Sequence, residues 1–293
     1  MKKNLFSTAL LLLIFSLLIS GCANPEKPAI PPSVNIKSDL AGEDPLVETN
    51  NPVEGWAVLA EKDDYSEVGM SELPVDYIYI SRMRGALEKQ GWDPAQIHDL
   101  KEFDQEALKT ELDWLEENAD GNDLVFFYVT GHGTYLRKNI AWSSFFPEEW
   151  AQIPANTRIL VVDACTAAEF TIPIEGDPNP HLSIAAVDKD EYGWKGLEEE
   201  GLPIIGGIFT FYFAEALADL AADGDGDGMV SIQEAVLAAE TKQREYMHKV
   251  VFAVPEFVES YHGLGIEPEK DESFPDVIVY DSIEKPVFLT VAD

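Results

Sequence analysis

The chain has 293 residues, of which 46% are hydrophobic, so it is long enough to form a complete apolar core in one large domain or two small ones. Its formal net charge of −34 argues against nucleic acid as a partner, because phosphate binding needs Lys and Arg in excess. The negative charge favours cationic ligands or peptides, and it is equally expected of a solvated acidic surface in a salty or extracellular setting.

The first 21 residues are predicted to be a signal peptide. Lys2 and Lys3 form a charged n-region, and residues 10–19 form an apolar h-region that is too short, with these flanks, for a spanning helix. Ile19-Ser-Gly-Cys22 resembles the bacterial lipobox, in which the cysteine is diacylated and becomes the mature N-terminus. Cys22 is therefore the predicted lipidation site, and its acyl chains would hold the protein at the outer side of a bacterial membrane. The alternative is a plain secreted protein with a cysteine at this position by chance.

The next segment, residues 22–52, is predicted to be an extended tether. It combines scattered charges with six prolines, at positions 25, 28, 31, 32, 45 and 52. No internal boundary is evident after it, so residues 53–293 are predicted to form a single domain.

Short apolar runs alternate with helical patterns along this domain. Buried strands are predicted at residues 56–60, 123–130, 158–163 and 181–187, with short late strands at 277–280 and 287–291. Helices are predicted from residue 75 to Gly91, from Asp104 onward, at 209–222 and at 231–248. Strands that alternate with helices are joined by crossovers into a mostly parallel sheet. The sequence therefore predicts an α/β fold of three layers, with the sheet between helices.

Two of the buried strands end at chemically reactive residues. His132 follows the strand at 123–130, and Cys165 follows the strand at 158–163. Ligand sites of open α/β sheets lie beyond the carboxyl ends of the strands, so neighbouring strands would bring this imidazole and this thiol into one crevice. A thiol becomes a good nucleophile when a nearby imidazole takes its proton. Lipidation would use the other cysteine of the sequence, which draws attention to Cys165 as a reactive thiol in an exported protein.

The neighbours of the two residues add to this interpretation. Gly133 lets the backbone approach a substrate, and an amide there could bind a tetrahedral oxyanion together with the N–H of Cys165. Asp163 lies two residues before Cys165, so strand alternation puts both side chains on the same side. A carboxylate there would suit a basic residue on the acyl side of the scissile bond, although a carboxylate bonded to local backbone is the alternative.

The segments Phe-Phe-Tyr-Val-Thr-Gly-His132-Gly and Ile-Leu-Val-Val-Asp163-Ala-Cys165 resemble the two signatures of the caspase-like cysteine peptidases. This clan includes caspases, metacaspases, legumains and clostripain, and the order of elements is similar over residues 53–260. The resemblance implies a three-layer caspase-like fold, a His132–Cys165 dyad, Gly133 as an oxyanion donor and Asp163 in an acidic specificity pocket.

The chain also resembles this clan downstream of the two signatures, and it departs from some clan members beside Cys165. Gly207-Ile-Phe-Thr-Phe-Tyr-Phe resembles the segment that opens the small-subunit half of bacterial legumain- and metacaspase-like proteins. Thr166-Ala-Ala replaces the His-Ser-Gly typical of metacaspases, and the caspase Gln-Ala-Cys-Arg-Gly is absent, so cleavage after aspartate is not expected. Arginine or lysine is the leading expectation, and asparagine is the alternative. Clan members are often nicked in the segment that corresponds to residues 171–207, which predicts self-cleavage after Lys189 or Lys195.

An acidic glycine-rich loop at residues 223–234 is a second candidate site. Oxygen ligands fall at loop positions 1, 3, 5, 9 and 12, with glycine at position 6 for the sharp turn and a main-chain carbonyl at position 7. This is the EF-hand pattern, and helices are predicted on both sides, so Ca²⁺ is the expected metal; a polar turn without an ion is the alternative. No organic cofactor is expected. The predicted ligands are Asp223, Asp225, Asp227, Met229 through its carbonyl, Ser231 and Glu234.

Together these features predict a lipid-anchored, Ca²⁺-binding cysteine endopeptidase that acts on proteins or peptides outside the cytoplasm. Two alternatives remain open from the sequence. One is a non-catalytic calcium-binding envelope lipoprotein on the same fold. The other is a transpeptidase that uses the same dyad and thioester.

Overall fold

The computed structural model describes residues 52–73, 75–196 and 201–291. The predicted signal peptide, the lipidation site Cys22 and all but the last residue of the tether lie outside the described residues. Within the described ranges, no helix combines the length and the apolar character needed to cross a membrane.

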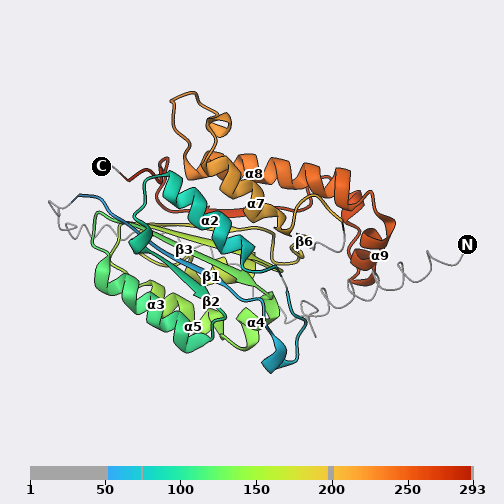
Figure 1. Ribbon diagram of the computed structural model, residues 1–293, viewed down its shortest axis with the longest axis horizontal. Coiled ribbons are helices and arrows are strands. Elements are labelled where there is room, and N and C mark those ends of the chain that lie inside the picture. Colours follow the sequence, from blue (N-terminus) through green and yellow to red (C-terminus); the bar gives the residue numbers. More distant parts are fainter. Residues whose placement is uncertain (1–51, 74, 197–200, 292–293) are drawn as a thin grey trace, which may run out of the picture.

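A six-stranded sheet forms the centre of the domain, in the order β2-β1-β3-β4-β5-β8 (Figure 1). The first five strands are mutually parallel, and only β8 at the edge runs antiparallel to its neighbour β5. The strands are β1 (Gly55–Glu61), β2 (Ile97–Lys101), β3 (Leu124–Gly131), β4 (Thr157–Ala164), β5 (His181–Ala185) and β8 (Ile278–Asp281). A separate two-stranded ladder pairs β6 (Lys195–Gly196) with β7 (Gly206–Gly207).

Helices cover both faces of this sheet (Figure 1). Side chains of α2, α7 and α8 share one hydrophobic cluster with the sheet, and side chains of α3, α4, α5 and α6 share a second cluster on the opposite face. The helices on the first face are α2 (Ile78–Lys89), α7 (Ile208–Leu217) and α8 (Ile232–Tyr246); those on the second are α3 (Gln105–Asn118), α4 (Gly133–Lys138), α5 (Trp142–Trp150) and α6 (Ala168–Thr171).

A third cluster joins α9 (Pro255–Gly263) to the segment around Trp194. The remaining elements are single turns. They are the 3₁₀ turns Ser66–Val68, Pro94–Gln96, Ile172–Ile174, Leu220–Ala222 and Pro268–Lys270, and the π-helical turn Met247–Val251 that extends α8.

Burial explains why the central strands read as continuous apolar runs. Along β3, Phe126 and Tyr128 point into the first cluster, whereas Phe127 and Val129 point into the second. Both faces of the strand are therefore covered, as expected for a parallel sheet between helices. The prediction of an α/β domain with a mostly parallel sheet flanked by helices is confirmed.

Individual elements differ in how well the sequence predicted them. The strands that became β1, β3, β4, β5 and β8 are confirmed, and α3 is confirmed with Asp104 as its N-cap, because the Asp104 side chain accepts the Ala107 N–H at 2.9 Å. The strand predicted at 287–291 is wrong: the described part of this segment joins no ladder. Instead, the carbonyl of Val287 accepts the N–H of Ile232 at 2.8 Å, so the segment covers the start of α8. Strand β2 and helices α4, α5 and α9 were not predicted.

Candidate active site

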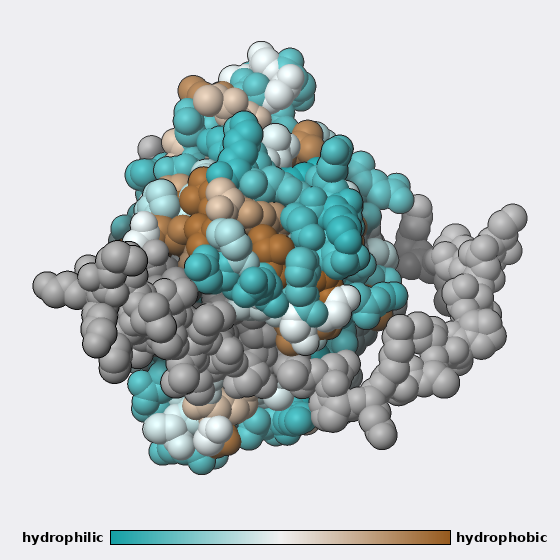
Figure 2. All heavy atoms as spheres, turned by 90° about the vertical axis from the view of Figure 1, so that its right-hand side faces the viewer, coloured by the Kyte–Doolittle hydropathy of each residue, from teal (hydrophilic) through white to brown (hydrophobic). Residues whose placement is uncertain are grey.

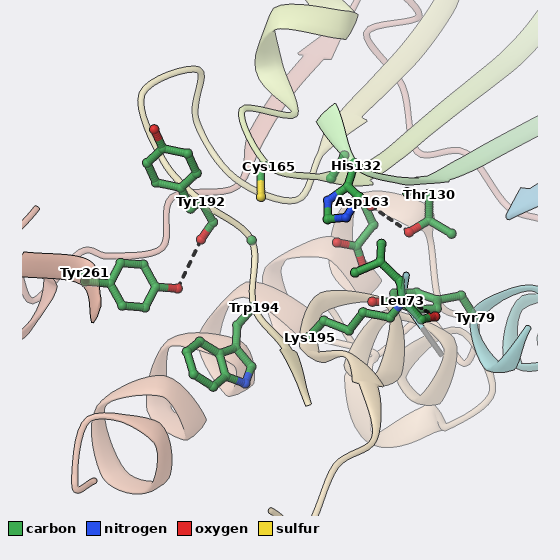
Figure 3. A pocket seen from close by; sticks show the side chains of 13 residues that line it. Leu73, Tyr79, Thr130, His132, Asp163, Cys165, Tyr192, Trp194, Lys195 and Tyr261 are labelled. Carbon is green, nitrogen blue, oxygen red and sulfur yellow. Dashed lines mark hydrogen bonds between the residues drawn. The ribbon is translucent and has the colours of Figure 1, made fainter. Parts of the chain in front are cut away.

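The sheet brings His132 and Cys165 to the same edge. Strands β3 and β4 are parallel neighbours in a register that puts Gly131 opposite Ala164, so each candidate residue directly follows a paired strand end. Both line one cavity of about 70 Å³ at the carboxyl ends of the strands (Figure 3). Its lining residues are Leu73, Tyr79, Thr130, Gly131, His132, Asp163, Ala164, Cys165, Tyr192, Gly193, Trp194, Lys195 and Tyr261.

His132 is held on both its main chain and its ring. Its N–H donates to the phenol oxygen of Tyr65 at 2.8 Å, and the two rings lie 4.7 Å apart between centroids. Its Nε2 lies 3.0 Å from the carbonyl oxygen of Ser71, which can only accept, so Nε2 carries the ring proton. Nδ1 is then the nitrogen able to take a proton from a nucleophile. Burial lowers the pKa of His132 to about 4, an effect that the Ser71 contact opposes and the nearby Lys195 ammonium reinforces. The imidazole is therefore neutral near pH 7, as a general base must be.

The chain turns sharply at Cys165. Thr166 has a φ of 55°, in the left-handed region that a β-branched residue adopts only under strain. Its N–H donates to the carbonyl of Glu191 at 2.8 Å, and its hydroxyl accepts from Arg137 at 2.9 Å, so these contacts hold the turn. The turn ends β4 and directs the chain away from the sheet immediately after Cys165.

Gly133 lies directly against this turn. A Cβ atom at position 133 would come within 2.2 Å of the carbonyl oxygen of Cys165, a contact that no side chain allows. Gly133 is also the first residue of α4, and amides in the first turn of a helix have no acceptor within the helix. The close approach explains a glycine at this position, and its role as an oxyanion donor remains a prediction.

Asp163 lines the same cavity as His132 and Cys165 (Figure 3). Its Oδ2 accepts hydrogen bonds from the hydroxyl of Thr210 at 2.5 Å and from the N–H of the same residue at 3.3 Å. Thr210 belongs to the first turn of α7, so the carboxylate also faces the positive end of that helix. Burial nevertheless raises the pKa of Asp163 above its usual value. A Cβ atom on Gly207 would lie 2.4 Å from Oδ2, so a glycine there leaves room for the carboxylate.

Lys195 also belongs to the candidate site, although the sequence did not predict this position for it. Its side chain enters the cavity, where Nζ lies 3.3 Å from Oδ1 of Asp63 and donates to the carbonyl of Leu73 at 3.2 Å (Figure 3). The ammonium also lies 4.9 Å from the centroid of the Tyr79 ring. No local sequence pattern could have identified it, because its ion-pair partner is 132 residues away in the chain. Self-cleavage after Lys195, or after the exposed Lys189, remains a prediction.

Aromatic residues form the other side of the cavity. Tyr192, Trp194 and Tyr261 line it opposite Lys195, with the Trp194 and Tyr261 rings stacked 6.0 Å apart between centroids (Figure 3). On the face of the molecule where α9 and β6 lie, apolar residues gather in the middle and hydrophilic residues surround them (Figure 2). The cavity therefore offers one charged wall and one apolar wall, with His132 and Cys165 between them.

The predicted calcium loop connects the α7 side of the domain to α8. Oxygen atoms of Asp223, Asp225 and Asp227 lie within 4.8 Å of one another, so these three predicted ligands fit a metal ion. Glu234 is occupied differently: its Oε2 accepts from the N–H and hydroxyl of Ser231, at 2.8 Å each, in the capping box of α8. Its Oε1 accepts the N–H of Gly224 at 2.8 Å. The three aspartates thus have the spacing to hold a metal ion, and they and Glu234 all accept hydrogen bonds from main-chain N–H groups of the loop.

The remaining predicted ligands, Met229 and Ser231, lie in the same loop. The Met229 side chain is exposed and its N–H donates to Asp227, so its carbonyl would be the ligand.

Comparison with known proteins adds nothing to this description: no protein-family model matches the chain, and no curated protein sequence matches it either.

Proposed function

We propose that the chain is a cysteine endopeptidase of the caspase-like clan, with Cys165 as nucleophile and His132 as general base. One observation carries the proposal: the two residues follow neighbouring parallel strands in direct register and line one cavity with a buried carboxylate. If His132 and Cys165 had only structural roles, the fold would need neither a cavity lined by both residues nor an acidic residue in the lining of that cavity.

The chemistry requires Cys165 in its reduced, thiol form, and it begins with transfer of the thiol proton to Nδ1 of His132. The sulfur attacks the scissile carbonyl carbon, and the resulting oxyanion is stabilised by main-chain amides, for which Gly133 and Cys165 are the candidates. His132 then gives its proton to the leaving amine, the C–N bond breaks, and a thioester remains on Cys165. Water, activated by the same imidazole, hydrolyses the thioester and restores the thiol. The Ser71 carbonyl keeps the imidazole in the tautomer that this sequence of transfers requires.

The carboxylate of Asp163, which lines the cavity, supports a substrate with a basic residue on the acyl side of the cut. Among the described residues, Asp163 has no cation within ion-pair distance, so its carboxylate can accept one from a substrate. Asparagine is the alternative, because its amide can donate a hydrogen bond to the same oxygen atoms.

The other parts of the proposal are the anchor and the metal. Lipidation at Cys22 would place the domain at the outer side of a bacterial membrane, at the end of the proline-rich tether. Ca²⁺ bound by the loop at 223–234 would hold the start of α8 against the end of α7, and its charge would offset the three clustered aspartates.

Labelling by peptidyl electrophiles tests the proposal. Acyloxymethyl ketones that carry Arg, Lys or Asn would be incubated with the protein under reducing conditions, with and without Ca²⁺, and the modified residue located by mass spectrometry. The expected result is modification of Cys165, lost in His132→Ala because the thiol is then no longer activated. An unmodified protein would contradict the proposal and favour a non-catalytic lipoprotein. With a peptide substrate in place of the ketone, ligation of an added amine to the acyl fragment would instead indicate a transpeptidase.

A further inference from the structure

Among the described residues that line the cavity, Lys195 is the one that presents an ammonium group to it. The side chain is only 12% exposed, and it leaves the short ladder in which Lys195 pairs with Gly207. Its Nζ contacts Oδ1 of Asp63 and the carbonyl of Leu73. A lysine is rarely held in this way, because burial of its ammonium is costly unless acidic groups surround it.

Acidic groups do surround it. Asp63 and Glu61 come from the end of β1 and the turn after it, and Asp163 comes from the end of β4. Glu61 is fully buried, its Oε2 accepts the Ile80 N–H at 3.0 Å, and its Oε1 has no hydrogen-bond partner among the described atoms. Burial and the neighbouring Asp63 raise the pKa of Glu61 to about 8, whereas Lys195 acts in the opposite direction.

The other charged groups near this cluster point elsewhere. Arg82 of α2 donates to the carbonyl of Ile205 at 2.7 Å and lies over the Phe211 ring, and it does not line the cavity. Lys62 pairs with Glu102 at 3.0 Å, on the β2 side of β1. Among the described residues that line the cavity, Lys195 is therefore the one cation, and it lies among Asp63, Glu61 and the cavity residue Asp163.

We propose that Lys195 is a specificity-determining residue that occupies the cation position of the cavity, so that a basic side chain of a peptide binds there in competition with the Lys195 ammonium. The inference rests on the pocket of the proposed function, and it deepens that function by naming what sets the affinity of the pocket for basic residues. An incoming guanidinium meets the carboxylate of Asp163 together with the repulsion of Lys195. Removal of the ammonium leaves Asp63 and Asp163 to attract the ligand alone.

The size of the effect follows from Coulomb repulsion between like charges at short range. Two unit charges a few ångströms apart in a partly buried site interact strongly enough that loss of one like charge changes cation affinity by about tenfold or more. Lys195→Met keeps the length and the apolar stem of the side chain and removes only the charge. The matched control is Lys189→Met, in the same connecting segment, because Lys189 is exposed and does not line the cavity.

The test measures binding, not turnover, so that it does not depend on the proposed chemistry. In a Cys165→Ala background, calorimetry would measure binding of the peptide Ac-Ala-Ala-Arg-NH₂ and of its norleucine analogue. Lys195→Met is expected to bind the arginine peptide at least tenfold more tightly, with the norleucine peptide unchanged, and Lys189→Met is expected to match the background protein. Equal or weaker binding of the arginine peptide by Lys195→Met, or no detectable binding at millimolar concentration, would overturn the inference.

A second pair of variants covers the case in which Lys195→Met does not fold, since it leaves buried carboxylates without their cation. Asp63→Asn removes the ion-pair partner, and the double variant Lys195→Met/Asp63→Asn is expected to bind the arginine peptide more tightly than Asp63→Asn alone. Failures of the two proposals are distinguishable. Tighter binding without any peptide cleavage by the protein with Cys165 intact would leave this inference standing and refute the peptidase; cleavage without tighter binding would do the reverse.

Discussion

The phenol of Tyr65 is hydrogen-bonded to the main chain of His132. Its oxygen accepts the His132 N–H at 2.8 Å and donates to the carbonyl of Lys62 at 2.9 Å, so one hydroxyl links the end of β3 to the turn after β1. The ring also packs on the imidazole, and the residue is 1% exposed. The position of His132, the proposed general base, therefore depends on a side chain 67 residues earlier in the sequence.

Tyr65→Phe is expected to lower kcat about tenfold or more and to change KM little. The substitution leaves the His132 N–H and the Lys62 carbonyl without their partner, and a small displacement of the base is costly in rate. Steady-state kinetics on a fluorogenic peptide would measure the two constants separately. Tyr135→Phe is the control, because it loses a buried hydrogen bond to the Phe103 carbonyl and leaves the hydrogen bond between Tyr65 and His132 in place. Equal losses of kcat in both variants would contradict a positioning role for Tyr65.

Gly133→Ala is expected to reduce kcat/KM by roughly a hundredfold. The added Cβ would overlap the Cys165 carbonyl, which is main chain and cannot rotate away, so the nucleophile or α4 must move. Gly85→Ala in α2 is the matched control, since a Cβ there meets nothing within 4 Å and alanine favours a helix. Unchanged kinetics in Gly133→Ala would show that the close contact does not hold Cys165 in place.

The contribution of Glu61 to the stability of the protein is expected to fall as the pH rises from about 5 to 8, and Glu61→Gln is expected to lose less stability over this range than the wild type. Burial keeps Glu61 protonated in the folded state to about pH 8, whereas the unfolded chain releases that proton near its usual pKa of 4.5. The folded state therefore binds more protons across this window, so its stability declines with rising pH. Thermal melting of wild type, Glu61→Gln and the exposed control Glu148→Gln at pH 5, 7 and 9 measures the effect. Parallel curves for all three proteins would contradict a buried, protonated Glu61.

Calcium is expected to raise the melting temperature by roughly 5 °C at concentrations about a hundredfold above Kd, because an ion that binds only the folded state stabilises it. Asp225→Asn should weaken this response, since it removes one charge of the cluster and keeps an oxygen that can accept the Asp227 N–H. Asp219→Asn, just before the loop, is the control. Identical melting in Ca²⁺ and in EDTA would reduce the loop to a polar turn before α8.

The sequence predicted the layers of the fold and the end of the sheet at which the site lies. Continuous apolar runs such as β3 arise because both faces are buried, and that signal is local. Strand β2 was missed because only Ile97 of its five residues is fully buried, which is typical of an edge strand with a weak hydrophobic pattern. The segment 287–291 has a strand-like composition, but its described residues cover the start of α8 without joining the sheet, a tertiary choice that composition does not encode.

The candidate site divides in the same way. His132, Cys165 and Asp163 could be placed from the sequence because each follows or ends a strong strand, and parallel strands end at one edge of the sheet. Tyr65 and Lys195 could not, because each reaches the cavity from a segment whose position depends on the whole fold. Their contacts span 67 and 132 residues, respectively.

Peptide cleavage by the wild-type protein and by Cys165→Ala tests the central claim most directly. Both proteins would be incubated under reducing conditions, with Ca²⁺, with matched fluorogenic peptides that differ only in the residue before the cut: Arg, Lys, Asn, Asp or Leu. We expect the wild type to cleave after Arg or Lys, with Asn as the alternative, and Cys165→Ala to lose this activity by at least a thousandfold. Equal turnover by both proteins, or no turnover of any peptide by the wild type, would contradict the account.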